Sequence, residues 1–210
     1  MRSHIRGNSI QLWLFVGVNF AIFLSIFVSK EISGSSIDDF WKRVTAKDGI
    51  IAACIPVLTV VLNGLLGDIA KARLVFWHWR DPLPGCRVFT DLMSADPRID
   101  ARALENAHGE LPNAPRAQNN LWYEFYKKHN EALQVSQGHR VYLLTRDMTA
   151  LSAVLALLFV VGLVLKPINW RVALLYGIAL IIQYLVLATA ARNYGKRFVL
   201  NVLAEESHSR

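Results

Sequence analysis

The chain has 210 residues, of which 53% are hydrophobic, and it carries a formal net charge of +7. Its two cysteines do not suggest a disulfide framework, and the absence of a C-x-x-C pair excludes metal binding by paired cysteines. The charged residues are segregated, because four long windows contain almost none of them, and this pattern is typical of a membrane protein.

The first apolar window covers residues 10–28. About nineteen helical residues match a hydrocarbon core of roughly 30 Å. Arg2 and Arg6 resemble the basic start of a signal peptide, but the apolar run is too long and no A-x-A-like cleavage site follows it. We therefore expect a retained helix that spans the membrane.

The second window covers residues 49–67 and is predicted to form a hairpin with the first. In the loop between them, Phe40 and Trp41 are expected at the membrane interface. The N-terminal transmembrane hairpin thus occupies residues 1–67.

Residues 68–147 form the next segment, an insert with a helical pattern. Its first part, DIAKARLVFWHW, is predicted to continue the second span outward until DPLPG ends it. We expect the aromatic side chains of the insert to be either anchors at the membrane interface or the aromatic core of the insert. These are Phe76, Trp77, Trp79 and Trp122.

Two further helices are predicted inside the insert. The first has Asp96 as its N-cap, Pro97 at its first position and Gly109 as its stop. The second covers residues 118–134 and places Leu121, Phe125, Ala132 and Leu133 on one apolar stripe. The following residues are expected to continue directly into the third span, with Gly138 as the weak point.

The third and fourth windows, residues 148–165 and 172–191, are joined by the short turn KPINW and form a C-terminal transmembrane hairpin. Residues 192–210 follow as a basic tail. The expected fold class is therefore an all-α integral membrane protein with four transmembrane helices and a helical cytosolic insert between the second and the third.

The distribution of lysine and arginine predicts the orientation. With both termini in the cytoplasm, 17 of the 23 Lys and Arg residues lie on the cytoplasmic side, as the positive-inside rule requires. Anionic lipids at the inner membrane account for the positive charge, so a nucleic-acid partner is not expected.

Amide side chains interrupt the apolar windows at Asn19, Asn63 and Gln183. They either join helices by hydrogen bonds or line a narrow polar path in an oligomer. No Asp, Glu, Lys or Arg lies in mid-span, which argues against a proton-coupled transporter.

Charged residues mark the points where the insert joins the spans. Asp68 follows the second window, while Arg146 and Asp147 precede the third. A contact between Asp68 and Arg146 would fasten the insert to the spans and couple their movements. The alternative is a solvent-screened ion pair worth less than about 1 kcal/mol.

Arg102 and His108 have the R-x(4-6)-H spacing that resembles the catalytic motif of HEPN-type ribonucleases. The simpler interpretation is that His108 is a cation near a helix C-terminus. The sequence contains no other catalytic motif and no metal or cofactor motif, so we expect neither a cofactor nor an enzyme.

The four spans and the insert resemble, in layout, the small four-span effectors of bacterial antiviral operons, such as those encoded beside nucleotide second-messenger synthases. The resemblance covers the whole chain as architecture. It implies a homo-oligomer in which the insert senses a cytosolic protein or small molecule and the spans alter membrane permeability as a pore. Two alternatives remain: a membrane scaffold without a pore, and a membrane-tethered ribonuclease that uses Arg102 and His108.

Overall fold

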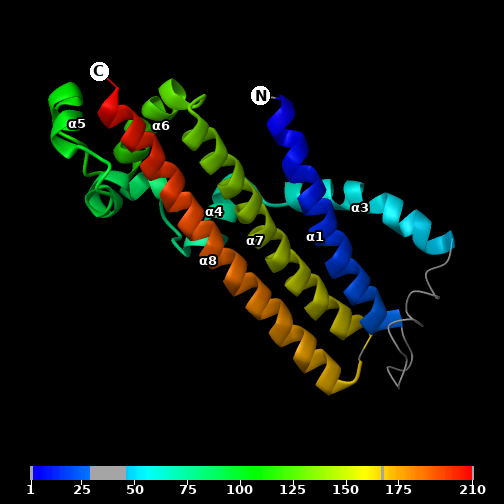
Figure 1. The fold of residues 1–210 in the computed structure, drawn as a ribbon. Coiled ribbons are helices and arrows are strands. Elements are labelled where there is room, and N and C mark those ends of the chain that lie inside the picture. The colour runs from blue at the N-terminus through cyan, green and yellow to red at the C-terminus, as the bar shows by residue number, and fades with distance from the viewer. Residues whose placement is uncertain (1, 29–45, 167, 210) are drawn as a thin grey trace. The chain divides into compact units, whose positions relative to one another are not determined.

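A computed structural model describes residues 2–28, 46–166 and 168–209, and these residues contain helices and no strand (Figure 1). The seven longer helices are α1 (Arg2–Val28), α3 (Ala46–Gly64), α4 (Asp68–Phe76), α5 (Ala101–His108), α6 (Pro115–His129), α7 (Leu133–Leu165) and α8 (Trp170–His208). Three short helical turns cover Pro84–Arg87, Val88–Leu92 and Met93–Ala95. The expectation of an all-helical chain is confirmed for the described residues. Phe40 and Trp41 lie outside them.

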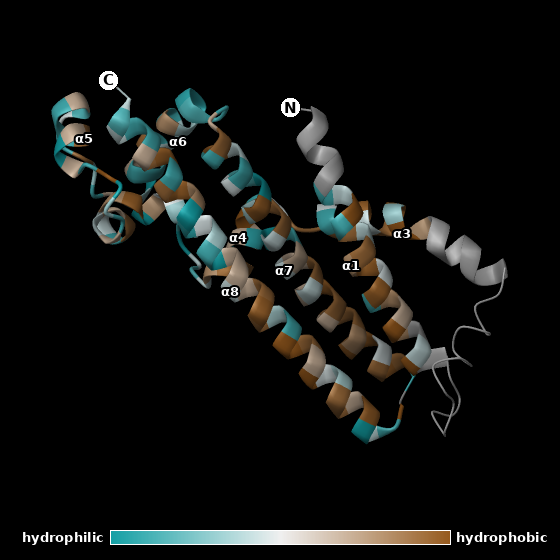
Figure 2. Ribbon diagram, viewed as in Figure 1, coloured by the Kyte–Doolittle hydropathy of each residue, from teal (hydrophilic) through white to brown (hydrophobic). Residues whose placement is uncertain are grey.

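Two of the described helices, α7 and α8, are long and apolar enough to cross a membrane. A third span is counted if Cys54–Gly64 and α4 are taken together, and Asn8–Phe23 is a shorter apolar helix. In α7 and α8 the apolar residues are concentrated in the segments joined by the turn after Leu165, as the brown ribbon in Figure 2 shows. These segments coincide with the predicted third and fourth spans.

The chain divides into two compact units, and the first contains Met1–Leu66 and Ala150–Leu185. Within it, Phe159 and Leu180 are buried and join α7 to α8, and the Phe159 ring meets Tyr176 edge-on at 4.9 Å between ring centroids. Large apolar side chains such as Leu157, Val164 and Leu175 remain exposed. An exposed apolar surface of this kind suits lipid contact.

The second unit contains Gly67–Thr149 and Val186–Arg210, so it combines the insert with the C-terminal part of α8. Its core includes Val88, Phe89, Leu104, Trp122, Phe125, Val135, Tyr142, Phe198, Val199, Val202 and Leu203. The last four residues belong to the predicted basic tail. Residues 192–208 are therefore a core helix of this unit, and not a separate tail.

The local predictions at the start of the insert need two corrections. The helix continuing the second span is a separate helix, α4, and it ends at Phe76 before DPLPG, because Trp77 adopts a left-handed conformation with φ of 57°. The N-cap of α5 is Asp100, whose carboxylate accepts a hydrogen bond from the Ala103 N–H at 3.0 Å, and not Asp96. Gly109 does stop α5, with φ of 78°.

The predicted helix over residues 118–134 ends earlier, at His129. Its buried residues are Gln118, Trp122 and Phe125, whereas Leu133 is exposed and begins α7. As expected, α7 continues through Gly138 into the predicted third span. Gly138 lies close to α8, because a Cβ atom there would be 3.3 Å from Asn201 Nδ2.

Candidate functional site

Four charged side chains form a chain of ion pairs between the first turn of α4 and α7. Arg146 Nη1 lies 3.0 Å from Asp68 Oδ1, so the expected contact is present, and Arg146 Nη2 lies 2.9 Å from Asp147 Oδ1. Lys71 Nζ adds a contact of 3.2 Å to the same Asp147 oxygen. We call Asp68, Lys71, Arg146 and Asp147 the neck cluster.

The members of the neck cluster differ in their burial. The Lys71 side chain is 6% exposed, whereas that of Asp68 is 77% exposed. A buried charge must be paired, while an exposed pair contributes little. The Lys71–Asp147 contact is therefore the stronger part of the cluster, and the sequence interpretation missed Lys71. Its signal was its position one helical turn after Asp68.

The aromatic residues separate into a core pair and an exposed pair. Trp122 is buried and donates its Nε1–H to the Val199 carbonyl at 3.2 Å, and Phe76 packs against the same core. Trp79 is 81% exposed, and Trp77 is also exposed, with the Arg192 guanidinium 3.6 Å from its ring centroid. Of these four residues, Trp77 and Trp79 are the two whose exposure suits an interface anchor.

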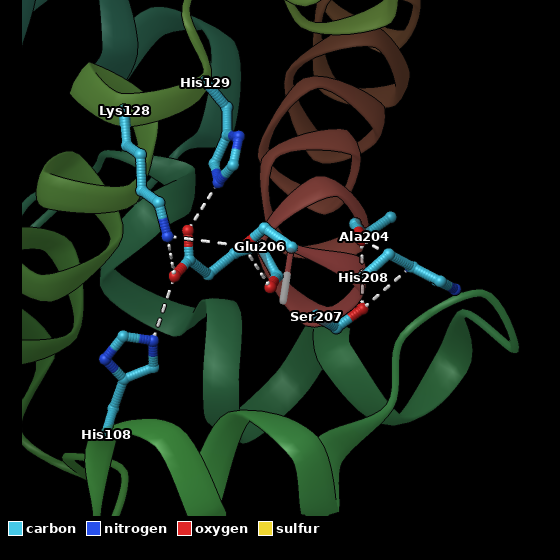
Figure 3. A network of polar contacts seen from close by, with 8 residues as sticks. His108, Lys128, His129, Ala204, Glu206, Ser207 and His208 are labelled. Atoms are coloured by element: carbon cyan, nitrogen blue, oxygen red, sulfur yellow. Dashed lines mark hydrogen bonds and ion pairs between the residues drawn. The ribbon is translucent and has the colours of Figure 1, made fainter.

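A buried carboxylate joins three helices of the second unit (Figure 3). Glu206 on α8 has a side chain that is only 4% exposed. Its Oε1 lies 2.9 Å from Lys128 Nζ and 3.0 Å from His108 Nε2, and its Oε2 lies 2.5 Å from His129 Nε2. We call these four residues the Glu206 cluster.

Burial alone would raise the pKa of Glu206, but hydrogen bonds from Lys128, His129 and His108 outweigh it and hold the pKa below its usual value. Because an ionised carboxylate only accepts hydrogen bonds, both imidazoles donate from Nε2. The sequence signal for this cluster was present but not used. Glu206 continues the α8 stripe formed by Phe198, Val199, Val202 and Leu203, so an acid at this position had to be buried.

The Glu206 cluster bears on the ribonuclease hypothesis. His108 is the last residue of α5, at the helix C-terminus where the sequence placed it, and its Nε2 is hydrogen-bonded to Glu206. Arg102 is exposed on the same helix. The structure thus gives His108 a packing partner, and the catalytic role of the pair stays a prediction.

The amide side chains of the apolar helices have partners within the chain. Asn19 is buried and donates Nδ2–H to the Phe15 carbonyl of its own helix at 2.9 Å. Gln183 on α8 donates to the Ser152 hydroxyl on α7 at 3.2 Å. Asn63 is half-buried in α3. The Gln183 contact is the type of hydrogen bond that joins neighbouring membrane helices.

The described residues contain no group of three or more His, Cys, Asp or Glu that could hold a metal ion. The chain matches no protein-family model, no curated protein and no solved structure. Its function is therefore inferred from its own residues.

Proposed function

We propose that the chain is a four-span protein of the bacterial inner membrane with both termini in the cytoplasm. It acts as an oligomeric effector: the insert and the C-terminal part of α8 respond to a cytosolic ligand or partner, and the spans change the permeability of the membrane. The main support is that α7 and α8 each contribute residues to both compact units without a break.

Continuous helices transmit movement, because their hydrogen bonds resist bending except at a kink or bulge. Residues 133–149 of α7 pack in the unit with the insert, and residues 150–165 belong to the apolar unit. The neck cluster is located just before this change, at Arg146 and Asp147. A rearrangement of the insert would therefore turn or shift the apolar segment of α7.

The alternative of a membrane scaffold without a pore is favoured by one observation. Asn19 and Gln183 already have partners within the chain, so neither amide needs a water-filled path to satisfy its hydrogen bonds. In a scaffold, these amides would serve packing alone.

A measurement of membrane potential tests the two proposals. Wild type, Arg102→Ala and the triple variant Asn19→Leu, Asn63→Leu, Gln183→Leu are expressed in bacteria to equal levels in the membrane fraction, and a potential-sensitive dye is followed. The effector proposal predicts depolarisation by wild type and Arg102→Ala and none by the triple variant. Arg102 is used alone because a change at His108 would also break the Glu206 cluster.

Absence of depolarisation in all three strains would contradict the permeability change and favour the scaffold. Equal depolarisation by all three would support the effector proposal but show that the three amides do not line the permeation path. Intact cellular RNA in the wild-type strain would argue against the ribonuclease.

A further inference from the structure

A cleft beside α4 has a volume of about 470 Å³, which falls within the usual range for small-ligand sites. Three arginines, Arg73, Arg80 and Arg116, contribute to its lining together with Ile69, Trp79 and Asp81. All of them belong to the second unit. The neck and Glu206 clusters share none of these residues.

The lining carries an excess of positive charge, since three guanidinium groups face one carboxylate. Two of the arginines make one hydrogen bond each: Arg73 Nε donates to the Trp79 carbonyl at 3.1 Å, and Arg116 Nε donates to Asp81 Oδ1 at 3.2 Å. Both bonds involve the Nε atom of the arginine. Among the described residues, Arg80 makes no hydrogen bond or ion pair. The Nη groups that remain suit a phosphate, whose oxygens match the guanidinium fork.

The position of the cleft indicates where the phosphate comes from. Ile69 and Arg73 lie in the first two turns of α4, directly after the predicted second span. Asp68 at the start of α4 contacts Arg146, which lies two residues before the predicted third span. Because the predicted second span ends directly before α4 in the chain, we expect the cleft at the level of the lipid head groups.

The exposed apolar side chains at the cleft agree with this position. Trp79 is 81% exposed and Ile69 is also exposed, although both line a site rich in arginine. Tryptophan with arginine is the combination found where a protein surface meets head groups on one side and acyl chains on the other. If the site faced only water, these two apolar side chains would have no apolar surface to contact.

We propose that this cleft binds the phosphate of an anionic phospholipid, with Arg80 as its main ligand and Arg73 and Arg116 as supporting cations. Trp79 and Ile69 contact the glycerol and the first acyl carbons of the lipid. The proposal rests on the membrane placement in the proposed function but not on the permeability change. A failure of lipid binding would therefore leave the depolarisation test unaffected.

The test uses the full chain purified in a neutral detergent and titrated with phosphatidylglycerol, with binding followed by native mass spectrometry. Phosphatidylcholine is the zwitterionic control lipid. We expect Arg80→Gln to weaken phosphatidylglycerol binding about fivefold, as the loss of one cation near a charged head group predicts. Arg102→Gln is the matched control, because it removes the same charge from an exposed position on α5 outside the cleft.

A second variant, Trp79→Ala, is expected to weaken lipid binding without changing the charge, and thermal unfolding of each variant verifies that the fold is intact. Equal binding of the two lipids, or equal losses in Arg80→Gln and Arg102→Gln, would overturn the proposal. Glycerol 1-phosphate distinguishes the source of the phosphate. If it competes at the same concentration as the lipid, the ligand is a soluble phosphate compound and the lipid assignment is wrong.

Discussion

Glu206 is the residue at which burial and charge are in strongest conflict. Its carboxylate lies among apolar side chains of the second unit and is compensated by one ammonium and two imidazoles. A buried carboxylate without such partners would be neutral or would destabilise the fold. The cluster therefore holds α5, α6 and α8 in one arrangement.

Replacement of Glu206 by Gln is expected to lower the free energy of unfolding by about 2 kcal/mol, because it leaves the donors without an ionised acceptor. Thermal or denaturant unfolding of the full chain in micelles measures this loss. Glu205→Gln is the control, because it removes the neighbouring carboxylate, which is not part of the Glu206 cluster. Equal stability of the two variants would contradict the role of Glu206.

The same substitution has a predicted pH dependence. The pKa of Glu206 is lowered on folding, so its stabilising contribution is present above the unfolded pKa of about 4.3 and is lost as the pH falls through the folded pKa. The difference in melting temperature between wild type and Glu206→Gln should therefore shrink below about pH 4. A difference that stays constant into this range would show that ionisation is not the cause.

At the scale of elements, the neck cluster links α4 to α7 through pairs of unequal strength. Lys71→Met is expected to lower the free energy of unfolding by about 2 kcal/mol. The loss is smaller than for a buried charge left without any partner, because Asp147 still has its ion pair with Arg146. Asp68→Asn should cost less than about 1 kcal/mol, since its carboxylate is exposed. Melting of both variants in the same detergent provides the comparison, and a larger loss in Asp68→Asn would reverse this ranking.

The sequence predicted the elements that depend on local chemistry. Gly109 ends α5, and α7 continues through Gly138 because no proline interrupts it. The prediction of Asp96 as the N-cap was wrong, because Asp100 caps α5. Asp96 instead binds Arg98 at 2.6 Å, and Arg98 also reaches Asn201 on α8 at 3.1 Å, a tertiary contact that the local pattern does not contain.

The extension of α8 was missed for a related reason. Arg192, Lys196 and Arg197 give residues 192–210 the charge pattern of a basic tail, although an apolar stripe begins at Phe198. For the same reason the Glu206 cluster was not predicted. Its members are separated by up to 98 positions, so only the packed fold brings them together.

At the scale of the whole molecule, the second unit is discontinuous in sequence. Its core needs Val88, Trp122 and Phe125 from the insert together with Phe198 and Val202 from α8. The insert by itself therefore lacks one side of its core.

We expect residues 68–147 expressed alone to melt without a cooperative transition, because the apolar face that α8 covers is exposed. A chain in which residues 186–210 are joined to this segment by a flexible linker should show cooperative melting by circular dichroism. Cooperative melting of residues 68–147 alone would show that α8 is not required. A linked chain with Phe198→Asp and Val202→Asp is the matched control and should melt like the insert alone.

The discontinuous core also imposes an order on biosynthesis. Phe198 emerges from the ribosome about 50 residues after the insert is complete, which at 5 to 20 residues per second is a delay of roughly 3 to 10 s. In the proposed arrangement, the third and fourth spans are delivered to the membrane during this time, while the insert still exposes its apolar face. Chaperones are expected to hold the nascent insert in this interval, and a ribosome that stalls before Phe198 would leave a membrane-tethered, aggregation-prone chain for proteolysis.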